Sequence, residues 1–366
     1  MTAVPNGERW ARAAWSRLAE PGDPVAARLI AEHGVEAALR RLPTLPEGGP
    51  RGRFGARWPG LDVAQDLQRA AAIGARLLTP ADPEWPAGVD DLPIPPIALW
   101  VRGPLELGAV TARSVAIVGA RAATGYGESV AAELAAALGS RGYAVVSGAA
   151  FGIDAAAHRG ALAVQAATIA VLAGGVDRPY PAAHARLLAQ IAAQGIVVSE
   201  APPGAAPMKQ RFLQRNRLIA AMTAGTVVVE AGLRSGSRNT AGTAAELCRI
   251  VMAVPGPVTS MSSAGCHEMI RCGLASLVTD ADEVAELVSA MGLELAPVRR
   301  GPQRPTDGLD EVSLRVLDAL PAQRGSPVPR LAEVAGLAAS EVRAALGRLE
   351  IVGLARRDGP GWCRGS

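Results

Sequence analysis

Six short apolar runs, separated by stretches of helical composition, occupy the middle of the chain. They predict strands at 114–120, 143–148, 168–173, 195–200, 226–231 and 250–255. Each connection is long enough to hold a crossover helix, and such a pattern is typical of a parallel sheet covered on both faces. We therefore predict an α/β fold built on an extended Rossmann-like parallel sheet, in which ligands bind beyond the carboxyl ends of the strands.

Helical patterns flank this sheet in the sequence. On the N-terminal side, amphipathic segments predict three short helices, at 8–20, 25–34 and 35–42. Residues 43–60, rich in Pro and Gly, predict a loose connection, and the Pro-rich run DLPIPPIALW within 61–108 fits no regular element. On the C-terminal side we predict three helices, at 311–320, 328–336 and 340–350. A hairpin with a Gly-rich turn follows them, which is the outline of a winged helix.

The length of 366 residues exceeds what one hydrophobic core usually holds. We predict an N-terminal helical, SAM-like domain at 1–75, a connecting segment at 76–109, the Rossmann-like domain at 110–292, a linker at 293–308 and a winged-helix-like domain at 309–366. The composition, 49% hydrophobic and 19% charged, excludes a disordered chain.

Charge and targeting signals narrow the function only slightly. The net charge of +3 is too small to indicate a polyanionic partner, so any nucleic-acid site must come from local clustering. The first residues lack the apolar stretch of a signal peptide, and no window approaches the roughly 20 apolar residues of a membrane span. Four cysteines do not make a disulfide framework. We expect a cytoplasmic protein without a membrane partner.

The first two predicted strands end in loops suited to an anion. Gly119 lets the backbone approach a ligand, Arg121 follows it, and the next helix begins with free N–H groups. The G-x-G-x-x-G spacing of dinucleotide sites is absent, and the second strand ends in Ser147 and Gly148, not in a ribose-binding acid. Phosphate binding is favoured here over a merely structural turn.

A basic segment without any acid, residues 209–217, follows the fourth strand. It contains Lys209, which is the only lysine of the chain, Phe212, which is one of three phenylalanines, and the cations Arg211, Arg215 and Arg217 with Asn216 between the last two. A charge run usually means a solvated helix face. Cations for the backbone together with an aromatic ring for a base are, however, what a nucleic-acid single strand requires.

The fifth strand is followed by a further anion-binding pattern. Ser235, Gly236 and Ser237 with Thr240 predict an anion-accepting nest at a helix start, and Arg234 and Arg238 add charge. Residues 242–246 read G-T-A-A-E, which weakly resembles the G-T-x-x-E stretch of nucleotide phosphoribohydrolases but lies inside the helix.

Other reactive residues give structural readings. We expect Phe151 to plug the domain and His158 to be a hydrogen-bonded core residue. The spacing of Cys266, His267 and Cys272 fits no zinc motif. No catalytic residue, metal or cofactor is expected.

The ordered motifs GAR, SGAAFGIDAAAH, AVLAGGVDRPYP, SEAPPG, FLQRNRLIAAM, VVVEA and SGSRNTA together resemble the DNA-processing protein A family, DprA or Smf, over about residues 110–280. The resemblance implies a homodimer that binds single-stranded DNA cooperatively, protects incoming DNA during natural transformation and helps to load RecA. It implies phosphate contacts at Gly119, Arg121, Ser147, Gly148 and Lys209, with base stacking on Phe212. Arg215, Asn216 and Arg217 match the RNR element of the family.

Four positions depart from the family pattern. The usual G-S-R reads Gly119-Ala120-Arg121, which removes one hydroxyl donor. Phe151 replaces a common Arg, whereas Arg238 and Asn239 replace residues that are usually apolar. The tail at 309–366 holds 7 acids and 8 bases, a net charge of +1 that is weak for duplex binding, so a protein contact is at least as well supported.

Two other functions stay open at this point. One is an enzyme that acts on a nucleotide, suggested by the shared fold and the G-T-x-x-E stretch. The other is a duplex-DNA regulator, which would rest on the winged helix alone. A DNA-binding mediator without catalytic turnover is the leading hypothesis.

Overall fold

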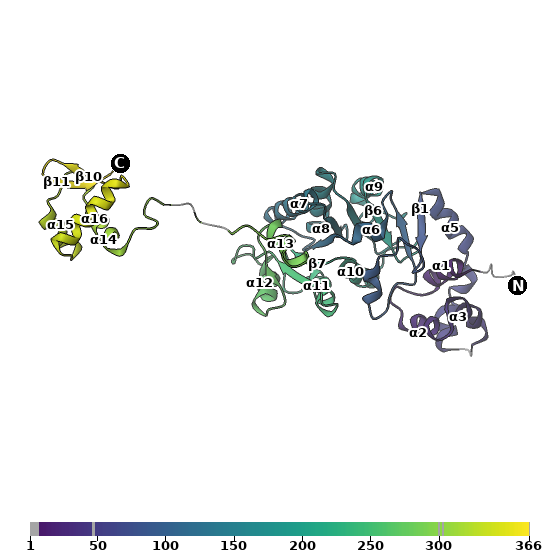
Figure 1. Ribbon diagram of the computed structural model, residues 1–366. Helices are drawn as coiled ribbons and strands as arrows, with labels where there is room; N and C mark the ends of the chain where they lie inside the picture. The colour runs from purple at the N-terminus through teal and green to yellow at the C-terminus, as the bar shows by residue number, and fades with distance from the viewer. Residues whose placement is uncertain (1–6, 46–47, 299–300, 302–303, 366) are drawn as a thin grey trace. The chain divides into compact units, whose positions relative to one another are not determined.

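A computed structural model describes residues 7–45, 48–298, 301 and 304–365 (Figure 1). The chain divides into two compact units, Met1–Ala296 and Pro297–Ser366. Parts of the predicted N-terminal domain, of the predicted linker and of the tail lie outside the described residues, namely 1–6, 46–47, 299–300, 302–303 and 366. The finer domain boundaries given above stay predictions.

A nine-stranded sheet forms the centre of the larger unit, with the order β1-β2-β6-β5-β4-β3-β7-β8-β9. The central strands are β3 (Ser114–Val118), β4 (Ala144–Ser147), β5 (Thr168–Val171), β6 (Ile196–Ser199), β7 (Gly225–Val228) and β8 (Ile250–Ala253). They pair in parallel, as does β9 (Ser276–Leu277) with β8. All six predicted strands are present, and the predicted α/β fold with an extended Rossmann-like parallel sheet is confirmed.

Helices cover both faces of this sheet. One face carries α7 (Gly125–Ser140), α8 (Ile153–Ala163), α9 (Ala185–Gln194) and α13 (Ala281–Val288). The opposite face carries α10 (Lys209–Ala221), α11 (Ser237–Glu246) and α12 (Ala264–Arg271) (Figure 1). Every residue of β3, β4 and β5 is buried, because side chains on both faces of a strand meet helices. This double burial explains why the strands appear in the sequence as unbroken apolar runs.

The direction of chain travel reverses at β3. From β3 the chain adds β4, β5 and β6 on one side, then returns through α10 to place β7 on the other side of β3. The change in the direction of the strand order therefore lies between β3 and β7, which pair with each other. In doubly wound sheets such a topological switch point opens a crevice at the carboxyl ends of the strands.

Two strands come from the mixed segment 61–108, for which we predicted no strand, and the second overlaps the end of its Pro-rich run. β1 (Ala75–Leu78) and β2 (Leu99–Arg102) pair antiparallel with each other, and β2 pairs antiparallel with β6. Each has four residues, too few for a clear period, and prolines at 93, 95 and 96 lie just before β2. η3 (Ala87–Asp91) and α6 (Leu107–Thr111) complete this segment.

The N-terminal helices pack on the β1–β2 end of the sheet. They are α1 (Glu8–Leu18), α2 (Pro24–His33), α3 (Val35–Arg41), α4 (Gly49–Gly55) and α5 (Val63–Ala72), with η1 (Leu42–Thr44) and η2 (Trp58–Gly60) between them. Trp15 is fully buried in their core, edge to face with Phe54 at 5.4 Å between ring centroids. The indole N–H of Trp100 on β2 donates to the Ser16 hydroxyl of α1 at 3.2 Å. The first three helices match the prediction, and α4 replaces part of the predicted loose connection.

The smaller unit has a core of its own. Its elements are α14 (Glu311–Ala319), α15 (Val328–Ala335), α16 (Ala339–Ile351), β10 (Ala355–Asp358) and β11 (Gly361–Arg364). The strands form an antiparallel hairpin, and an isolated bridge joins Ser326 to Trp362. Leu331, Val342 and Leu346 lie at the centre of its core. The three helices and the hairpin occur where the sequence places them, while the winged-helix assignment stays a prediction.

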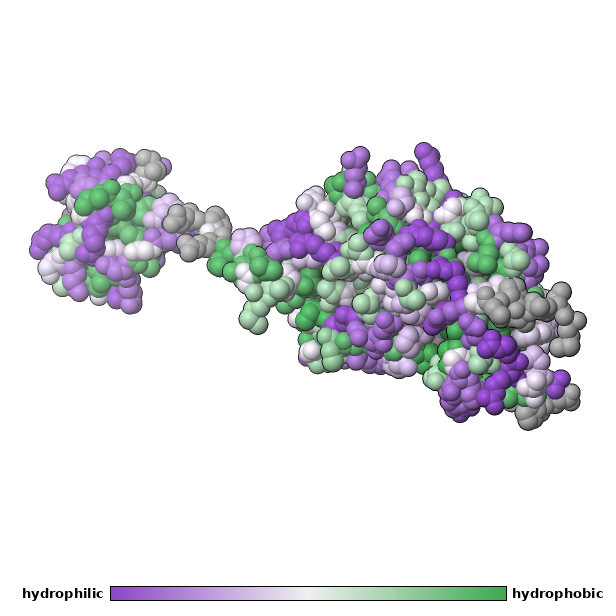
Figure 2. Space-filling model, turned by 45° about the vertical axis from the view of Figure 1, so that its right-hand side comes forward, coloured by the Kyte–Doolittle hydropathy of each residue, from purple (hydrophilic) through white to green (hydrophobic). Residues whose placement is uncertain are grey.

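The hydropathy of the surface is consistent with a buried apolar core in each unit. Figure 2 shows hydrophilic residues spread over much of the visible face of each unit. Within the described part of the chain, no helix combines the length and the apolar character that a membrane crossing requires.

Candidate nucleic-acid interface

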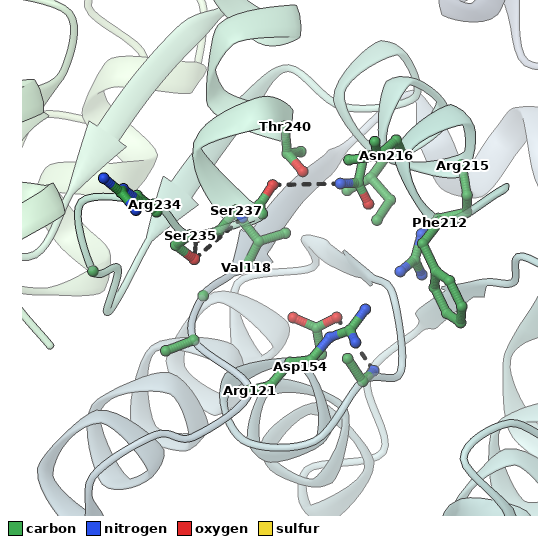
Figure 3. A pocket seen from close by; sticks show the side chains of 17 residues that line it. Val118, Arg121, Asp154, Phe212, Arg215, Asn216, Arg234, Ser235, Ser237 and Thr240 are labelled. Atoms are coloured by element: carbon green, nitrogen blue, oxygen red, sulfur yellow. Dashed lines mark hydrogen bonds between the residues drawn. The ribbon is translucent and has the colours of Figure 1, made fainter. Parts of the chain in front are cut away.

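A cavity of about 570 Å³ opens where the loops after β3, β4 and β7 meet (Figure 3). This place is the topological switch point of the sheet, where ligands of doubly wound folds bind. The cavity is lined by Val118, Gly119, Ala120, Arg121, Ala150, Asp154, Phe212, Leu213, Arg215, Asn216, Ile219, Gly232, Arg234, Ser235, Gly236, Ser237 and Thr240. Seven of the residues predicted for the site are among them: Gly119, Arg121, Phe212, Arg215, Asn216, Ser235 and Ser237.

The loop after β3 presents Arg121 to the cavity while its backbone serves packing. A Cβ atom on Gly119 would lie 2.4 Å from Ile153 Cγ1, so only glycine fits between β3 and α8. The N-terminus of α7 is capped by the Thr124 hydroxyl and faces the carboxylate of Glu230, which accepts from Thr124 N at 2.9 Å. The expected anion site at this helix start is therefore filled by the protein's own acid. Arg121 is exposed and is the cation that this loop presents to the cavity.

Ser147 and Gly148 lie behind the cavity and do not line it. The Ser147 hydroxyl donates to Ile117 O at 2.7 Å, and the side chain is fully buried. Gly148 N donates to Asp154 Oδ2 at 3.2 Å. A Cβ on Gly148 would lie 2.1 Å from Arg215 Nη1. The structure gives both positions a supporting role behind the lining, and the predicted phosphate contacts there stay predictions.

A buried acid and a buried base form the back wall of the cavity. Asp154 also accepts from Ala150 N at 3.3 Å, so it orders the β4–α8 loop and does not cap α8, whose N-cap is Gly152. Burial raises the pKa of Asp154, and the neighbouring Arg215 opposes that rise. Burial lowers the pKa of Arg215 to about 10, which leaves it charged at neutral pH. The back wall thus holds a buried carboxyl group beside a buried, charged guanidinium group.

The four cations of the basic segment have four different surroundings. Arg215 Nη1 donates to Gly148 O at 2.6 Å and is buried. Arg211 Nε bonds Glu20 at 2.6 Å, and Arg217 Nη2 bonds Glu200 at 2.5 Å. Lys209 begins α10, is exposed, and has no acidic partner within the described ranges. The prediction that these four cations lie together is wrong, because a helix points successive side chains to different faces. The predicted DNA contact at Arg217 is corrected to an internal ion pair.

Phe212 lies in the cavity wall beside two other groups suited to a nucleotide. The guanidinium of Arg121 stands 5.1 Å from its ring centroid, and the ring of Tyr180 lies 5.4 Å away. Tyr180 was not predicted as a site residue, because the sequence shows only that it follows β5. Phe151 was predicted to plug the domain, which is wrong: this side chain is 47% exposed, with its ring 4.7 Å from that of His184.

The start of α11 forms the third side of the cavity. The hydroxyls of Ser235 and Ser237 lie 2.7 Å apart, and the first N–H groups of α11 are held within the turn, with Ser237 N donating to Ser235 Oγ at 3.4 Å. Asn216 Nδ2 donates to Gly236 O at 3.4 Å and joins α10 to this turn. Arg234 lines the cavity without an acidic partner among the described residues. Hydroxyl groups beside a cation at the positive end of a helix suit an anion.

Arg238 occupies a different position from the one predicted. Its Nη1 donates to Leu233 O, and the residue does not line the cavity. We therefore correct its direct contact to a role in shaping the turn before α11. Its neighbour in the motif, Arg234, takes the place at the cavity. The motif R-S-G-S-R signalled both cations, but only the structure distinguishes them.

The remaining reactive side chains lie away from the cavity. Glu246, the acid of the G-T-A-A-E stretch, is exposed in the second half of α11 and is not a lining residue. His158 is buried with Nδ1 2.7 Å from the Thr168 hydroxyl, and burial lowers its pKa to about 3, so it is a neutral core residue as predicted. No group of three or more potential metal ligands occurs in the part of the chain that the structure describes.

Comparison with known proteins decides the family. A family model described as DNA recombination-mediator protein A matches residues 76–289, more than half of the chain. The chain belongs to this family. A Mycobacterium tuberculosis protein that carries the name DNA processing protein DprA is 46% identical over 368 residues, which cover 97% of this chain and 94% of that protein.

Solved structures agree with this membership of the DNA recombination-mediator protein A family. The X-ray structure of Streptococcus pneumoniae DNA processing protein A matches with a TM-score of 0.65 and 31% identity, over 77% of this chain and 98% of that one. A Helicobacter pylori DNA processing protein A matches with a TM-score of 0.53 and 28% identity, over 59% and 95%. That structure was described for its single-stranded DNA binding mode. The resemblance to DprA and Smf proteins found in the sequence is thereby confirmed.

Proposed function

We propose that this protein binds single-stranded DNA at the cavity between β3 and β7. Phosphates of the strand contact Arg121, Arg234 and the hydroxyls of Ser235 and Ser237 at the start of α11, and a base stacks on Phe212. Lys209 adds a cation at the start of α10. The observation that carries the proposal is the combination, in one cavity, of unpaired cations, two hydroxyls at a helix start and an aromatic ring. Its one acid, Asp154, is buried in the back wall.

The biological role follows from the family. The protein acts as a cytoplasmic recombination mediator that protects incoming DNA during natural transformation and helps to load RecA. It works as a homodimer and binds its strand without catalytic turnover. Support comes from the match over residues 76–289 and from the Helicobacter pylori relative, whose structure concerns single-strand binding. The smaller unit serves as a winged-helix-like module for protein contact, since the net charge of +1 over residues 309–366 favours no polyanion.

A nucleotide-processing enzyme on the same fold is the second candidate. The cavity volume of about 570 Å³ falls in the range of small-molecule sites. Against this function, Glu246 lies outside the cavity, and the buried Asp154 accepts hydrogen bonds from Gly148 N and Ala150 N. A hydrolase would need a free general acid or base at the reacting bond.

Gel shifts with a labelled single strand, the matching duplex and a salt titration test the leading function. We expect tight single-strand binding that weakens steeply with salt, and clearly poorer duplex binding. Equal or stronger duplex binding would favour a duplex regulator. Release of free base from nucleoside monophosphates would favour the enzyme.

Substitution of Phe212 tests the base contact. Phe212→Ala should weaken single-strand binding by roughly 1–3 kcal/mol, the usual contribution of one stacked base. Phe212→Trp should retain most of the affinity, since it keeps a flat ring in the wall. The melting temperature of each variant provides the control. Loss of folding by Phe212→Ala with unchanged residual affinity would assign Phe212 to the core.

A further inference from the structure

Exposed aromatic rings are concentrated at one edge of the molecule. Among the described residues, the aromatic side chains that are clearly exposed are Tyr126, Phe151 and Tyr180, at 43%, 47% and 47%. They follow β3, β4 and β5 respectively, so all three lie at the carboxyl edge of the sheet, beside the cavity. The chain is only 3% aromatic. Gathering its exposed rings at this edge is therefore a feature that the fold does not require.

Two of these rings continue the aromatic wall of the cavity. The ring of Tyr180 lies 5.4 Å from that of Phe212, at an angle of 53°. Four residues further along the same loop, the buried His184 holds the ring of Phe151 at 4.7 Å. His184 Nδ1 also lies 3.0 Å from Ala149 O, which fixes this loop to the loop after β4. Phe212 and Tyr180 are thus in ring contact, and Phe151 is joined through His184 to the loop that carries Tyr180; we call these three rings the row.

The charges along the row suit a nucleic-acid backbone. Arg121 stands over Phe212 at the inner end. Arg178, exposed in the Tyr180 loop, has no acidic partner among the residues the structure describes. The nearby Asp177 is occupied, because both of its oxygens accept from Gly204 N at 2.8 and 2.9 Å. Rings beside free cations, with the nearby acid held by a backbone N–H, match a single strand better than a protein partner.

We propose that Tyr180 and Phe151 extend the DNA site beyond the cavity, each stacking on a base of the strand whose phosphates bind in the cavity. The proposal rests on the proposed function and deepens it. Stacking tolerates any base, since every base has a flat face. Both rings are held in place by a neighbouring ring, so little side-chain freedom is lost when a base stacks on them.

Oligonucleotide length separates this extension from the cavity itself. Competition binding with dT3, which is long enough for the cavity, is compared with dT12, which can also follow the row. Phe151→Ala and Tyr180→Ala should each weaken dT12 binding roughly 5-fold or more and leave dT3 binding within about 2-fold. Phe151→Trp and Tyr180→Phe should restore dT12 binding, because they restore a flat ring.

Tyr126→Ala is the matched control. Tyr126 is nearly as exposed, at 43%, but stands near Glu230, whose charge together with burial raises the Tyr126 pKa. An acid there disfavours a phosphate backbone, so this variant should leave both oligonucleotides unaffected. Equal losses of dT12 affinity for Tyr126→Ala and Phe151→Ala would overturn the proposed path of the strand over Tyr180 and Phe151.

The outcomes distinguish the extension from the site on which it rests. No binding of dT12 by the unmodified protein would overturn the proposed function. Normal dT12 binding by both Ala variants, or equal loss of dT3 and dT12, would overturn only the extension. Photocrosslinking of the unmodified protein to a 5-iododeoxyuridine dodecamer gives a second readout that needs no variant. Peptides containing Phe151 or Tyr180 should carry the crosslink, and crosslinks confined to Phe212 would refute the extension.

Discussion

Arg121 and Lys209 are exposed and have no acidic partner within the described part of the chain, as is also true of Arg234 in the cavity wall. Arg121→Ala and Lys209→Ala should weaken binding to all single strands alike, since phosphate contacts carry no sequence information. Each should also reduce the slope of log affinity against log salt by about 0.7, the value for one phosphate contact on a single strand.

Arg40→Ala serves as the control for this pair. It removes the same charge from an exposed position on α3, where Arg40 pairs only with Glu36. We expect its salt slope to equal that of the unmodified protein. Slopes that fall equally in all three variants would show that total charge, not the cavity, governs binding.

Arg215 is the first residue of the RNR element, and its side chain supports the fold. It is 5% exposed, and its guanidinium donates to Gly148 O and Val171 O beside Asp154. Arg215→Ala would leave a buried acid and two carbonyls without their partner. The free energy of unfolding should fall by on the order of 3 kcal/mol in urea titrations, whereas Arg121→Ala should change it by less than about 0.5 kcal/mol. Equal stability of the two variants would contradict the buried role.

At the scale of the element, α10 places two cations of its first turn, Lys209 and Arg211, in different surroundings. Lys209 is exposed without an acidic partner among the described residues, whereas Arg211 joins α10 to the N-terminal helices through Glu20, which Arg57 also contacts. Burial and these two arginines have opposed effects on the pKa of Glu20, which is lowered overall. Arg211→Ala should therefore keep single-strand affinity within about 2-fold and lower stability by up to about 1 kcal/mol. The measurements are the gel shift and the urea midpoint, with Lys209→Ala expected to give the reverse result.

The elements also show what a sequence can and cannot predict. β3 to β8 were predictable because double burial makes each an unbroken apolar run. β1 and β2 were not, because four residues beside several prolines give no readable period. For the site, the sequence indicated which residue types line the cavity, but not which of the cations are already paired within the protein. The partner of Arg211 lies 191 positions away, and nothing near residue 211 in the sequence signals it.

Aromatic residues were misjudged for a related reason. A hydrophobic side chain in a loop is usually expected to be buried, so Phe151 was assigned to the interior. The structure instead supports its ring on His184, 33 positions further along the chain, and leaves 47% of the residue exposed. A contact between two loops at one edge of a sheet follows from topology, which the local pattern does not contain.

At the scale of the whole molecule, two units with separate cores share the chain. The cavity, the row of rings and every corrected or retained site residue belong to Met1–Ala296. The family match, residues 76–289, ends inside this unit. The smaller unit has its own helices, hairpin and core. DNA binding and the task of the smaller unit should therefore be separable.

Truncation after residue 296 tests this separation. The shortened protein should fold, because the core of the larger unit includes no residue of the tail. It should bind dT12 within about 3-fold of the full chain, since it keeps every cation and ring of the site. The isolated segment 309–366, with a net charge of +1, should show only weak, salt-sensitive duplex binding. Loss of dT12 binding on truncation, with an unchanged melting temperature, would instead assign the smaller unit a direct part in holding the strand.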